Sequence, residues 1–274
     1  MATDADSAHA EADDEARGQE RSQREADGRG AGARLVGAVK ELVVVLAMAL
    51  TLSFVVKTFL VQAFFIPSES MEDTLLVGDR VVVSKLTPGP FDLQRGDIVV
   101  FADPGGWLSE QDPVDHGPVL NGLRDGLVFV GLLPDTSEGH LIKRVIGLPG
   151  DHVKCCDAEG RLLVNGEPID EGAYVRPGEV ASLQEFDITV PAGRLWVMGD
   201  NRSDSSDSRF HDPGGSGQDG SVPTDLVVGK AAATVWPFDR LSGLSNHAEV
   251  FAQVPAPGSN RSIGPARSAE HSGT

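Results

Sequence analysis

The longest apolar run of the chain lies near its N-terminus, at residues 42–56, where fifteen consecutive residues carry no charge. A helix needs about 20 residues to cross the core of a bilayer. Lys57 ends the uncharged run, but a lysine near the end of a span can extend its ammonium group to the interface. The pattern therefore predicts a transmembrane helix at residues 41–61.

Two other interpretations of this run stay open. One is a cleaved signal peptide, because Val61-Gln62-Ala63 faintly resembles a small-residue cleavage site, although residues 1–40 make a poor start for such a peptide. The other is a buried core helix. Against it, an amphipathic core helix keeps one polar face, and this run has none.

Charges on the two sides of the run differ and predict its orientation. The N-terminal flank carries Arg24, Arg29, Arg34 and Lys40. On the other side, Lys57 is followed by acidic residues at positions 69, 72 and 73. Cytoplasmic flanks of membrane spans are enriched in Lys and Arg. We therefore expect a cytoplasmic N-terminus, with everything after about residue 61 outside the membrane.

Short apolar segments separated by turns replace the long run from residue 66 onward, and they predict a series of strands. The expected segments are 75–85 with a Gly-Asp turn inside it, 98–101, 141–148, 161–167 as a hairpin with an Asn-Gly turn, 186–190, 194–198 and 227–236. No helix-period pattern lies between them. The pattern indicates a mainly β fold with antiparallel sheets, preceded by one transmembrane helix.

The same pattern predicts the domain organisation. Residues 1–40 form a disordered cytoplasmic tail, since they contain almost no large apolar residues that could offset the entropy of ordering. After the span at 41–61, residues 62–251 form an extracytoplasmic β-rich domain, and 252–274 form a second disordered tail. Residues 103–139 are rich in Pro, Gly and Asp and form a long insertion with no assigned role.

The composition of the chain limits which partners it can bind and which metal sites it can form. A formal net charge of −18 over 274 residues argues against a nucleic-acid partner, which would require clustered Lys and Arg. The two cysteines, Cys155 and Cys156, are adjacent and therefore badly placed for an ordinary disulfide with each other. They are also too few for a structural zinc site. We expect two unremarkable thiols or one intermolecular bridge, and no metal or cofactor.

Two serines follow the apolar run, Ser68 and Ser70, behind Pro67, whose ring restrains the local backbone. A serine at this place could act on a peptide bond close to a bilayer, provided that a base activates it. The seven histidines lie in polar tails, turns or loops, and Gly214–Gly217 falls short of the G-x-S-x-G elbow. An S-x-x-K motif is also absent at Ser70, because Met71–Asp73 follows it. The remaining candidate base is a lysine.

Lys143 and Arg144 interrupt the apolar segment at residues 141–148. Alternate residues of a strand share a face, so one of the two cations must lie among apolar neighbours or at a sheet edge. Burial lowers the pKa of a lysine, and a neutral amine can take a proton from a serine hydroxyl. Arginine stays protonated, so chemistry favours Lys143 as the base and a structural Arg144. The alternative is an edge strand with two solvated cations.

A third stretch, residues 198–209, follows a predicted strand and is dense in Asp, Asn and Ser. Such side chains commonly bond to the backbone of a polar turn. They could instead support an active site. In that case Ser205 could hold the lysine amine, and Asp207 could lock the loop by pairing with Arg209.

Taken together, these stretches resemble the bacterial type I signal peptidases. The matching segments are Pro67–Leu75 (P-S-x-S-M-x-x-T-L), Gly96–Val99 (G-D-I-V), Lys143–Asp151 (K-R-V-I-G-L-P-G-D), and Gly199–Arg202 (G-D-N-R) with Asp207–Arg209 (D-S-R). Each segment alone is a modest signal. All of them in the order of the family, after one apolar span, make a specific one.

The resemblance implies a serine endopeptidase with Ser70 as nucleophile and Lys143 as general base. It implies that Ser68 and the Ser70 amide form the oxyanion hole and that Ser205 orients the lysine amine. Asp200, Asp207 and Arg209 would hold the surrounding loop.

The resemblance also implies a substrate, the signal peptide of a secreted preprotein, cut after a small residue with another small residue two positions earlier. An extended substrate could add to a sheet edge, with side-chain pockets lined by Phe64, Ile66 and Leu76. The expected location is the cell membrane, crossed once. The other expected partners are phospholipid and, as a neighbour, the export translocase.

Two other function classes are weighed against this one. Self-cleaving repressors share a Ser-Lys dyad, but they require a DNA-binding head where this chain has an apolar span. A non-catalytic, membrane-anchored β domain that binds exported proteins is the second. It would leave Ser70 unreactive and the pKa of Lys143 high.

Overall fold

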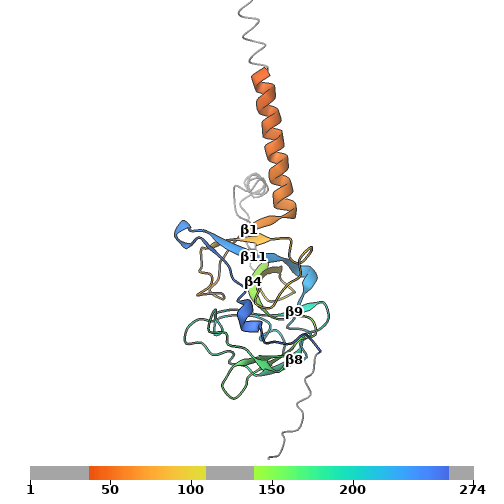
Figure 1. Cartoon of the computed structure of the whole chain (residues 1–274), viewed down its shortest axis with the longest axis vertical. Helices are drawn as coiled ribbons and strands as arrows, with labels where there is room; N and C mark the ends of the chain where they lie inside the picture. The colour runs from red at the N-terminus through yellow and green to blue at the C-terminus, as the bar shows by residue number, and fades with distance from the viewer. Residues whose placement is uncertain (1–36, 109–138, 259–274) are drawn as a thin grey trace, which may run out of the picture. The chain divides into compact units, whose positions relative to one another are not determined.

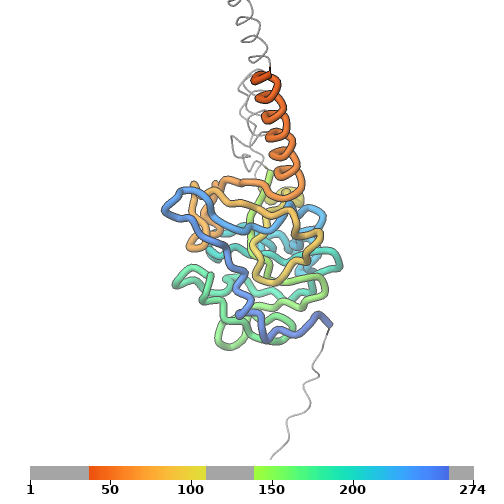
Figure 2. Tube along the Cα trace, turned by 45° about the horizontal axis from the view of Figure 1, so that its top comes forward, coloured from red at the N-terminus to blue at the C-terminus, as the bar shows by residue number. Residues whose placement is uncertain are grey.

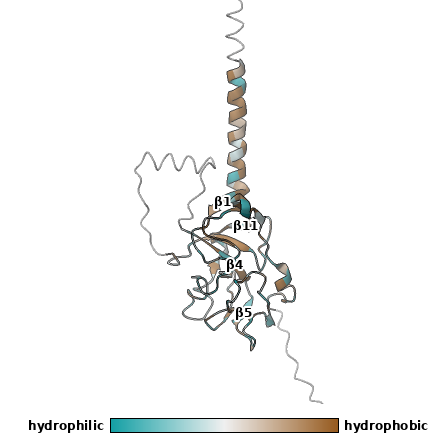
Figure 3. Ribbon diagram, turned by 90° about the vertical axis from the view of Figure 1, so that its left-hand side faces the viewer, coloured by the Kyte–Doolittle hydropathy of each residue, from teal (hydrophilic) through white to brown (hydrophobic). Residues whose placement is uncertain are grey.

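A computed structural model describes residues 37–108 and 139–258 of the chain. Three sets of predictions lie outside these ranges: those for residues 1–36 of the N-terminal tail, for residues 109–138 of the insertion, and for the last sixteen residues. One helix, Gly37–Phe59, is long and apolar enough to cross a membrane, and none of its most apolar window is buried. In Figure 3 most of the residues of this helix have the colour of hydrophobic residues. This exposure argues against a buried core helix.

The described parts of the chain form two sheets. The larger has eight strands in the order β1-β2-β11-β3-β4-β9-β10, with β12 paired to β11. Every pair is antiparallel, which confirms the predicted fold class. The strands are β1 (Val61–Phe65), β2 (Arg80–Ser84), β3 (Ile98–Ala102), β4 (His140–Gly147), β9 (Arg194–Met198), β10 (Val222–Pro223), β11 (Val227–Trp236) and β12 (Ser242–Gly243). Figure 1 shows β1, β11, β4 and β9 following one another across the β-rich part of the chain.

The smaller sheet has four strands in the order β7-β6-β5-β8, again all antiparallel. Its strands are β5 (His152–Cys155), β6 (Leu162–Val164), β7 (Glu167–Pro168) and β8 (Phe186–Thr189). The predicted Asn-Gly hairpin joins β6 to β7. Asn165 and Gly166 have φ angles of 54° and 83°, as a tight turn between antiparallel strands requires.

Within the described residues, three short 3-10 helices complete the regular structure: η1 (Thr224–Leu226), η2 (Phe238–Arg240) and η3 (Ala248–Phe251). Phe251 of η3 packs into the apolar cluster beneath the small sheet. The chain then continues in contact with the domain beyond the predicted boundary at 251, since the Pro255 carbonyl accepts hydrogen bonds from Arg95 and Asn165. Figure 2 shows this segment in dark blue, running along the β-rich part of the chain.

Strand β4 is the most deeply buried strand of the fold. All of its residues after His140 are buried. Its apolar side chains enter three clusters: Ile146 lies in one, Ile142 in a second, and Leu141 and Val145 in a third. The sequence of this strand is therefore almost continuously apolar because both of its faces are buried, so apolar and polar residues do not alternate along it.

Two of the expected strand assignments differ from the structure. Residues 75–78 form part of a turn rather than a strand, because the Leu75 amide bonds back to the Met71 carbonyl. Strand β1 begins at Val61, within the segment that the apolar run had assigned to the helix. Hydropathy cannot separate the end of a span from an apolar strand that follows it directly, and only pairing with β2 reveals the strand.

The prediction for the cysteines was wrong. Cys155 and Cys156 are joined in a disulfide. The peptide bond between them is cis, and their Cα atoms lie 3.0 Å apart. The expectation assumed a trans peptide, for which this separation is about 3.8 Å.

Candidate active site

Ser70 lies in the compact turn that connects β1 to β2. The turn closes through hydrogen bonds between Ile66 and Asp79 and between Gly78 and Ile66. Met71 and Leu75, both fully buried, anchor it to the core beneath the sheet. Ser70 itself is 6% exposed. The apolar residues of the motif thus hold the backbone of the serine in place, and its hydroxyl faces the sheet.

Lys143 lies in the middle of β4, paired in register with Val99 of β3. Because β4 lies between β3 and β9, the edge-strand alternative is wrong. Lys143 is only 4% exposed, and its Nζ donates a hydrogen bond of 2.6 Å to the Oγ atom of Ser70. The structure therefore brings together the two residues that sequence reasoning singled out as nucleophile and base.

Burial lowers the pKa of the Lys143 amine to about 8. The carboxylates of Asp207 and Asp200 oppose this change, and the charge of Arg209 adds to it. Desolvation outweighs the two carboxylates because an ammonium group without water loses most of its solvation energy. A substantial neutral fraction near neutral pH is what a general base requires.

The two expected oxyanion donors are the Ser68 hydroxyl and the Ser70 backbone amide. The Ser68 Oγ atom is 3.4 Å from the Ser70 Oγ atom. The Ser70 carbonyl accepts a bond of 3.2 Å from the Asn201 amide, and the Asn201 side chain donates to the Glu69 carbonyl at 3.1 Å. These bonds orient the peptide units on both sides of Ser70, and they leave its own amide without a partner in the described chain.

Asp207 and Arg209 form a buried ion pair, as the sequence suggested. Arg209 donates from Nε and Nη2 to the two carboxylate oxygens, each at 2.8 Å. The Gly199 amide donates to the same carboxylate at 2.9 Å. Burial raises the pKa of Asp207, but the bonds and charge of Arg209 outweigh it and leave the pKa below its ordinary value. Asp207 thus stays ionised and fixes the start of the loop.

Asp200 is held by a second buried pair, with Arg144 of β4. Arg144 donates to both of its oxygens, at 2.8 and 2.7 Å, and neither side chain is exposed. Thr74 donates to Asp200 at 2.6 Å, which links this pair to the serine turn. The guanidinium group also lies 4.2 Å from the ring centre of Tyr174. Arg144 is therefore structural, as its inability to lose a proton predicted.

The expected role of Ser205 has less structural support than the ion pairs of Asp207 and Asp200. It is 4% exposed and packs beside Gly199, close to the Ser70 carbonyl. Its hydroxyl approaches Asp207 closely enough to help lower the pKa of that carboxyl. It has no partner with hydrogen-bond geometry among the described residues, Lys143 included. Its role in orienting the amine stays a prediction.

Sequence reasoning missed one further pair, between Arg202 and Glu171. Arg202 donates to Glu171 from two nitrogens, at 2.9 and 2.6 Å, and to the Gly199 carbonyl at 3.0 Å. Tyr174 donates to the same carboxylate at 2.8 Å. Arg202 belongs to the Gly199–Arg202 segment, but nothing in the local sequence around Glu171 indicates that Glu171 is its partner.

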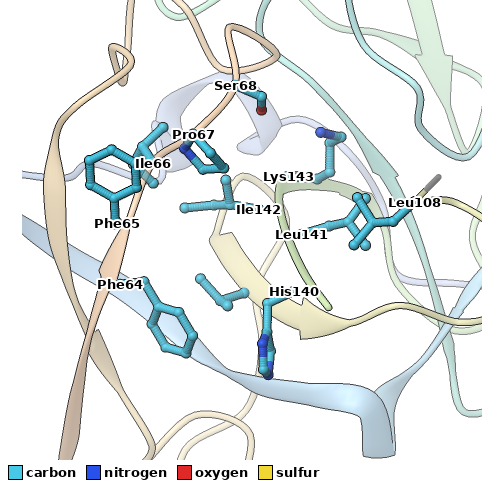
Figure 4. A pocket seen from close by; sticks show the side chains of 11 residues that line it. Phe64, Phe65, Ile66, Pro67, Ser68, Leu108, His140, Leu141, Ile142 and Lys143 are labelled. Atoms are coloured by element: carbon cyan, nitrogen blue, oxygen red, sulfur yellow. The ribbon is translucent and has the colours of Figure 1, made fainter. Parts of the chain in front are cut away.

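A cleft with about 490 Å³ of empty space, partly open to solvent, adjoins Lys143. Its wall is mainly apolar and is formed by Phe64, Phe65, Ile66, Pro67, Ser68, Val100, Leu108, His140, Leu141, Ile142 and Lys143. Figure 4 shows Ser68 and Lys143 at one end and Phe64 and His140 at the other. Two predicted pocket residues, Phe64 and Ile66, line this cleft. Leu76 is not among the lining residues, and its side chain is 36% exposed.

Comparison with known proteins identifies the family. Residues 39–236 match the family described as "Signal peptidase, peptidase S26". The chain is 38% identical to a probable signal peptidase I of Mycobacterium leprae, over 76% of this chain and 80% of that protein. It is 39% identical to a signal peptidase I of Mycobacterium tuberculosis, over 74% of each. A solved signal peptidase I from Enterococcus faecalis aligns with 51% of this chain and 97% of its own, at 26% identity and a TM-score of 0.30.

Proposed function

The chain belongs to the signal peptidases of peptidase family S26, and from this membership we propose that it removes signal peptides from exported preproteins by a Ser-Lys mechanism. One observation supports the mechanism above the others. The Lys143 amine lies 2.6 Å from the Ser70 hydroxyl in a site where burial lowers the amine pKa to about 8. An enzyme that uses a neutral lysine as base needs this proximity and this desolvation together.

In the proposed reaction, Ser70 Oγ attacks the carbonyl carbon of the scissile peptide bond while its proton passes to the neutral Lys143 amine. The carbonyl oxygen becomes an oxyanion, which Ser68 Oγ and the Ser70 amide stabilise. A single donor of this kind stabilises the transition state by about 2.7–4 kcal/mol in a comparable protease. Lys143 then returns its proton to the leaving amine, and the C–N bond breaks.

An acyl-enzyme ester on Ser70 remains after the first half of the reaction. Water attacks the ester carbon, with Lys143 again accepting a proton, and the ester bond to Ser70 breaks as the proton returns to Oγ. The buried pairs Arg144–Asp200 and Arg209–Asp207 support this cycle by holding β4, the serine turn and the loop at 199–209 in one arrangement.

We further propose that the helix Gly37–Phe59 anchors the enzyme in the cell membrane with the N-terminus in the cytoplasm. The basic residues before the helix and the acidic residues after Lys57 support this orientation. Strand β1 starts at Val61, directly after the helix in the chain. An anchored enzyme would meet signal peptides, which are themselves membrane-inserted, with the export translocase as a neighbour.

Two single substitutions test the mechanism. Ser70→Ala removes the nucleophile and Lys143→Ala removes the base, so each is expected to reduce preprotein cleavage by at least about 10³-fold, as for the loss of a nucleophile or base in other proteases. Cleavage of a purified preprotein is measured by gel mobility, and circular dichroism verifies the fold. Lys154→Ala and Ser242→Ala, at exposed positions outside the site, serve as matched controls. Ordinary activity in either active-site variant would refute the dyad.

A further inference from the structure

The segment at residues 171–182, between β7 and β8, packs against the loop at 199–209. Its backbone and side chains bond to that loop at several points: the Arg176 amide donates to the Asp200 carbonyl at 3.2 Å, Arg202 donates to the Ala181 carbonyl at 2.9 Å, and Arg209 donates to the Ser182 hydroxyl at 3.4 Å. No residue of the segment lines the cleft beside Lys143. The segment can therefore support the loop without touching a group bound in the cleft.

Glu171 is a buried anion of this segment, and its main partner, Arg202, is buried as well. The Oε1 atom of Glu171 accepts from the Tyr174 hydroxyl at 2.8 Å and from Arg202 Nη2 at 2.6 Å, and its Oε2 atom accepts from Arg202 Nη1 at 2.9 Å. Burial raises the pKa of Tyr174, and the charge of Glu171 adds to this, so the tyrosine stays protonated and donates. Both carboxylate oxygens are thus engaged, and they fix the guanidinium group of Arg202 in one orientation.

Arg202 carries this restraint to Ser70. Its Nε atom donates to the Gly199 carbonyl at 3.0 Å, which fixes the backbone between the two residues. Within that backbone the Asn201 amide donates to the Ser70 carbonyl at 3.2 Å. A Cβ atom on Gly199 would lie 2.4 Å from the same carbonyl, so the loop has no spare room against the serine. The orientation of the Arg202 side chain therefore decides how this backbone meets Ser70.

Without the charge of Glu171, Arg202 has a competing partner in Asp200. Burial alone would lower the pKa of Arg202, but Glu171 outweighs it, and the charge of Asp200 acts in the same direction as Glu171. In the structure Asp200 is bound by Arg144 and Thr74 instead. A buried cation without its anion is strongly destabilising, so Arg202 would be drawn toward Asp200 and would disturb these bonds.

We propose that Glu171 is a positioning residue for peptide-bond cleavage, which acts through Arg202 and holds the Gly199–Asn201 backbone in the place where it supports Ser70. Tyr174 assists, because its hydroxyl restrains the carboxylate of Glu171. The inference rests on the proposed function, since it takes Ser70 as the nucleophile. It adds a residue that acts on the nucleophile from outside the substrate cleft.

The test compares Glu171→Gln with the wild type in preprotein cleavage by the full-length enzyme in detergent. Glutamine keeps the shape of the side chain and removes the charge that holds Arg202. We expect kcat to fall about ten- to a hundredfold, because small displacements of reacting groups have effects of this size. KM is expected to change less than about twofold, since Glu171 lies outside the cleft. Circular dichroism at the assay temperature gives the folded fraction, and kcat is expressed per folded molecule.

Asp151→Asn is the matched control. Asp151 is also buried and pairs with Arg95 through two bonds, at 2.7 and 2.6 Å, but none of the bonds described for it reaches the loop at 199–209. It is expected to lower the melting temperature and to leave kcat per folded molecule within about twofold of the wild type. Tyr174→Phe is a milder variant that removes one bond to Glu171. Its kcat is expected to fall about three- to tenfold, as the loss of one hydrogen bond allows.

A wild-type kcat in folded Glu171→Gln would overturn the proposal. So would an equal loss of kcat in Asp151→Asn, or a loss of activity that lies in KM alone. If Glu171→Gln does not fold, Tyr174→Phe decides, and an unchanged kcat in that variant overturns the proposal. The proposed function fails separately, namely if the wild type does not cleave the preprotein or if Ser70→Ala does, so the two failures are distinguishable.

Discussion

At the scale of single residues, the candidate site depends on one amine in an unfavourable environment for charge. Lys143 is buried in the centre of a sheet, within reach of two carboxylates that would favour its charged form, and yet its pKa falls to about 8. Asp200 and Asp207 are each neutralised by an arginine in a bidentate pair, which weakens their influence on the lysine. The two ion pairs therefore act on the chemistry as well as on the loop structure.

The pKa of Lys143 predicts the pH dependence of the enzyme. The neutral amine is the active form, so kcat/KM is expected to be lost as the pH falls through about 8 and to decline about tenfold for each further pH unit. Cleavage rates of one preprotein across this range, at subsaturating substrate, measure the profile. A flat profile below pH 8 would argue against a lysine base.

A charge variant sharpens this measurement. The carboxylate of Asp204, an exposed residue of the loop, is among the groups that raise the pKa of Lys143. Asp204→Asn is expected to move the acidic limb of the profile to lower pH and to leave its shape unchanged. A shift to higher pH would contradict the assignment of that limb to Lys143.

At the scale of elements, the site is a junction between two segments that are distant in the chain. The serine turn between β1 and β2 meets the loop at 199–209, which follows β9. Four bonds join them: the Asn201 amide donates to the Ser70 carbonyl, the Asn201 side chain donates to the Glu69 carbonyl and to the Glu72 carboxylate, and Thr74 donates to Asp200. Gly199 lies at their closest approach, where any Cβ atom would overlap the Ser70 carbonyl and the Ser205 side chain.

Gly199→Ala tests this junction. The added methyl group must displace either the serine turn or Ser205, and overpacking of this kind costs roughly 1–3 kcal/mol of unfolding free energy. We expect a lower melting temperature and a large loss of preprotein cleavage. Gly214→Ala is the matched control, because a Cβ atom there has open space. If Gly199→Ala melts and cleaves like the wild type, the two segments are less tightly packed than the structure indicates.

At the scale of the whole molecule, the chain combines a strongly acidic composition with one apolar helix that has no buried face. The acidic charge favours solubility of the β-rich part and does not by itself indicate a partner. Exposed apolar surface of this kind favours aggregation in water, which supports the proposal that the helix lies in a bilayer.

The membrane assignment predicts a fractionation pattern. The full-length chain is expected to remain in the membrane pellet after an alkaline carbonate wash and to be released by detergent. Leu46→Arg with Leu50→Arg should weaken this retention, because each arginine near the centre of a span costs about 2.5–3.5 kcal/mol on insertion scales. Protease added outside the cytoplasmic membrane should degrade the β-rich domain and spare an N-terminal tag. The opposite pattern would invert the proposed topology.

Much of the fold could be predicted from local sequence. The apolar run, the turn signals and the Asn165-Gly166 hairpin anticipated the helix, most strands and their antiparallel pairing. The errors fell where local pattern is ambiguous. Strand β1 continues the apolar run of the helix, residues 75–78 are apolar but form a turn, and the adjacency of Cys155 and Cys156 argued against the disulfide that joins them.

The sequence alone determined the set of chemical groups. These are a serine after a restraining proline, a lysine between apolar residues, and a polar loop with acidic and basic side chains. What only the tertiary structure decided is their proximity and environment. Ser70 and Lys143 are 73 residues apart, and their bond exists because β4 lies inside the sheet and the serine turn folds against it. Strand order and burial arise from contacts between distant segments. No local pattern could therefore show that Lys143 is desolvated or that Arg144 is paired with Asp200.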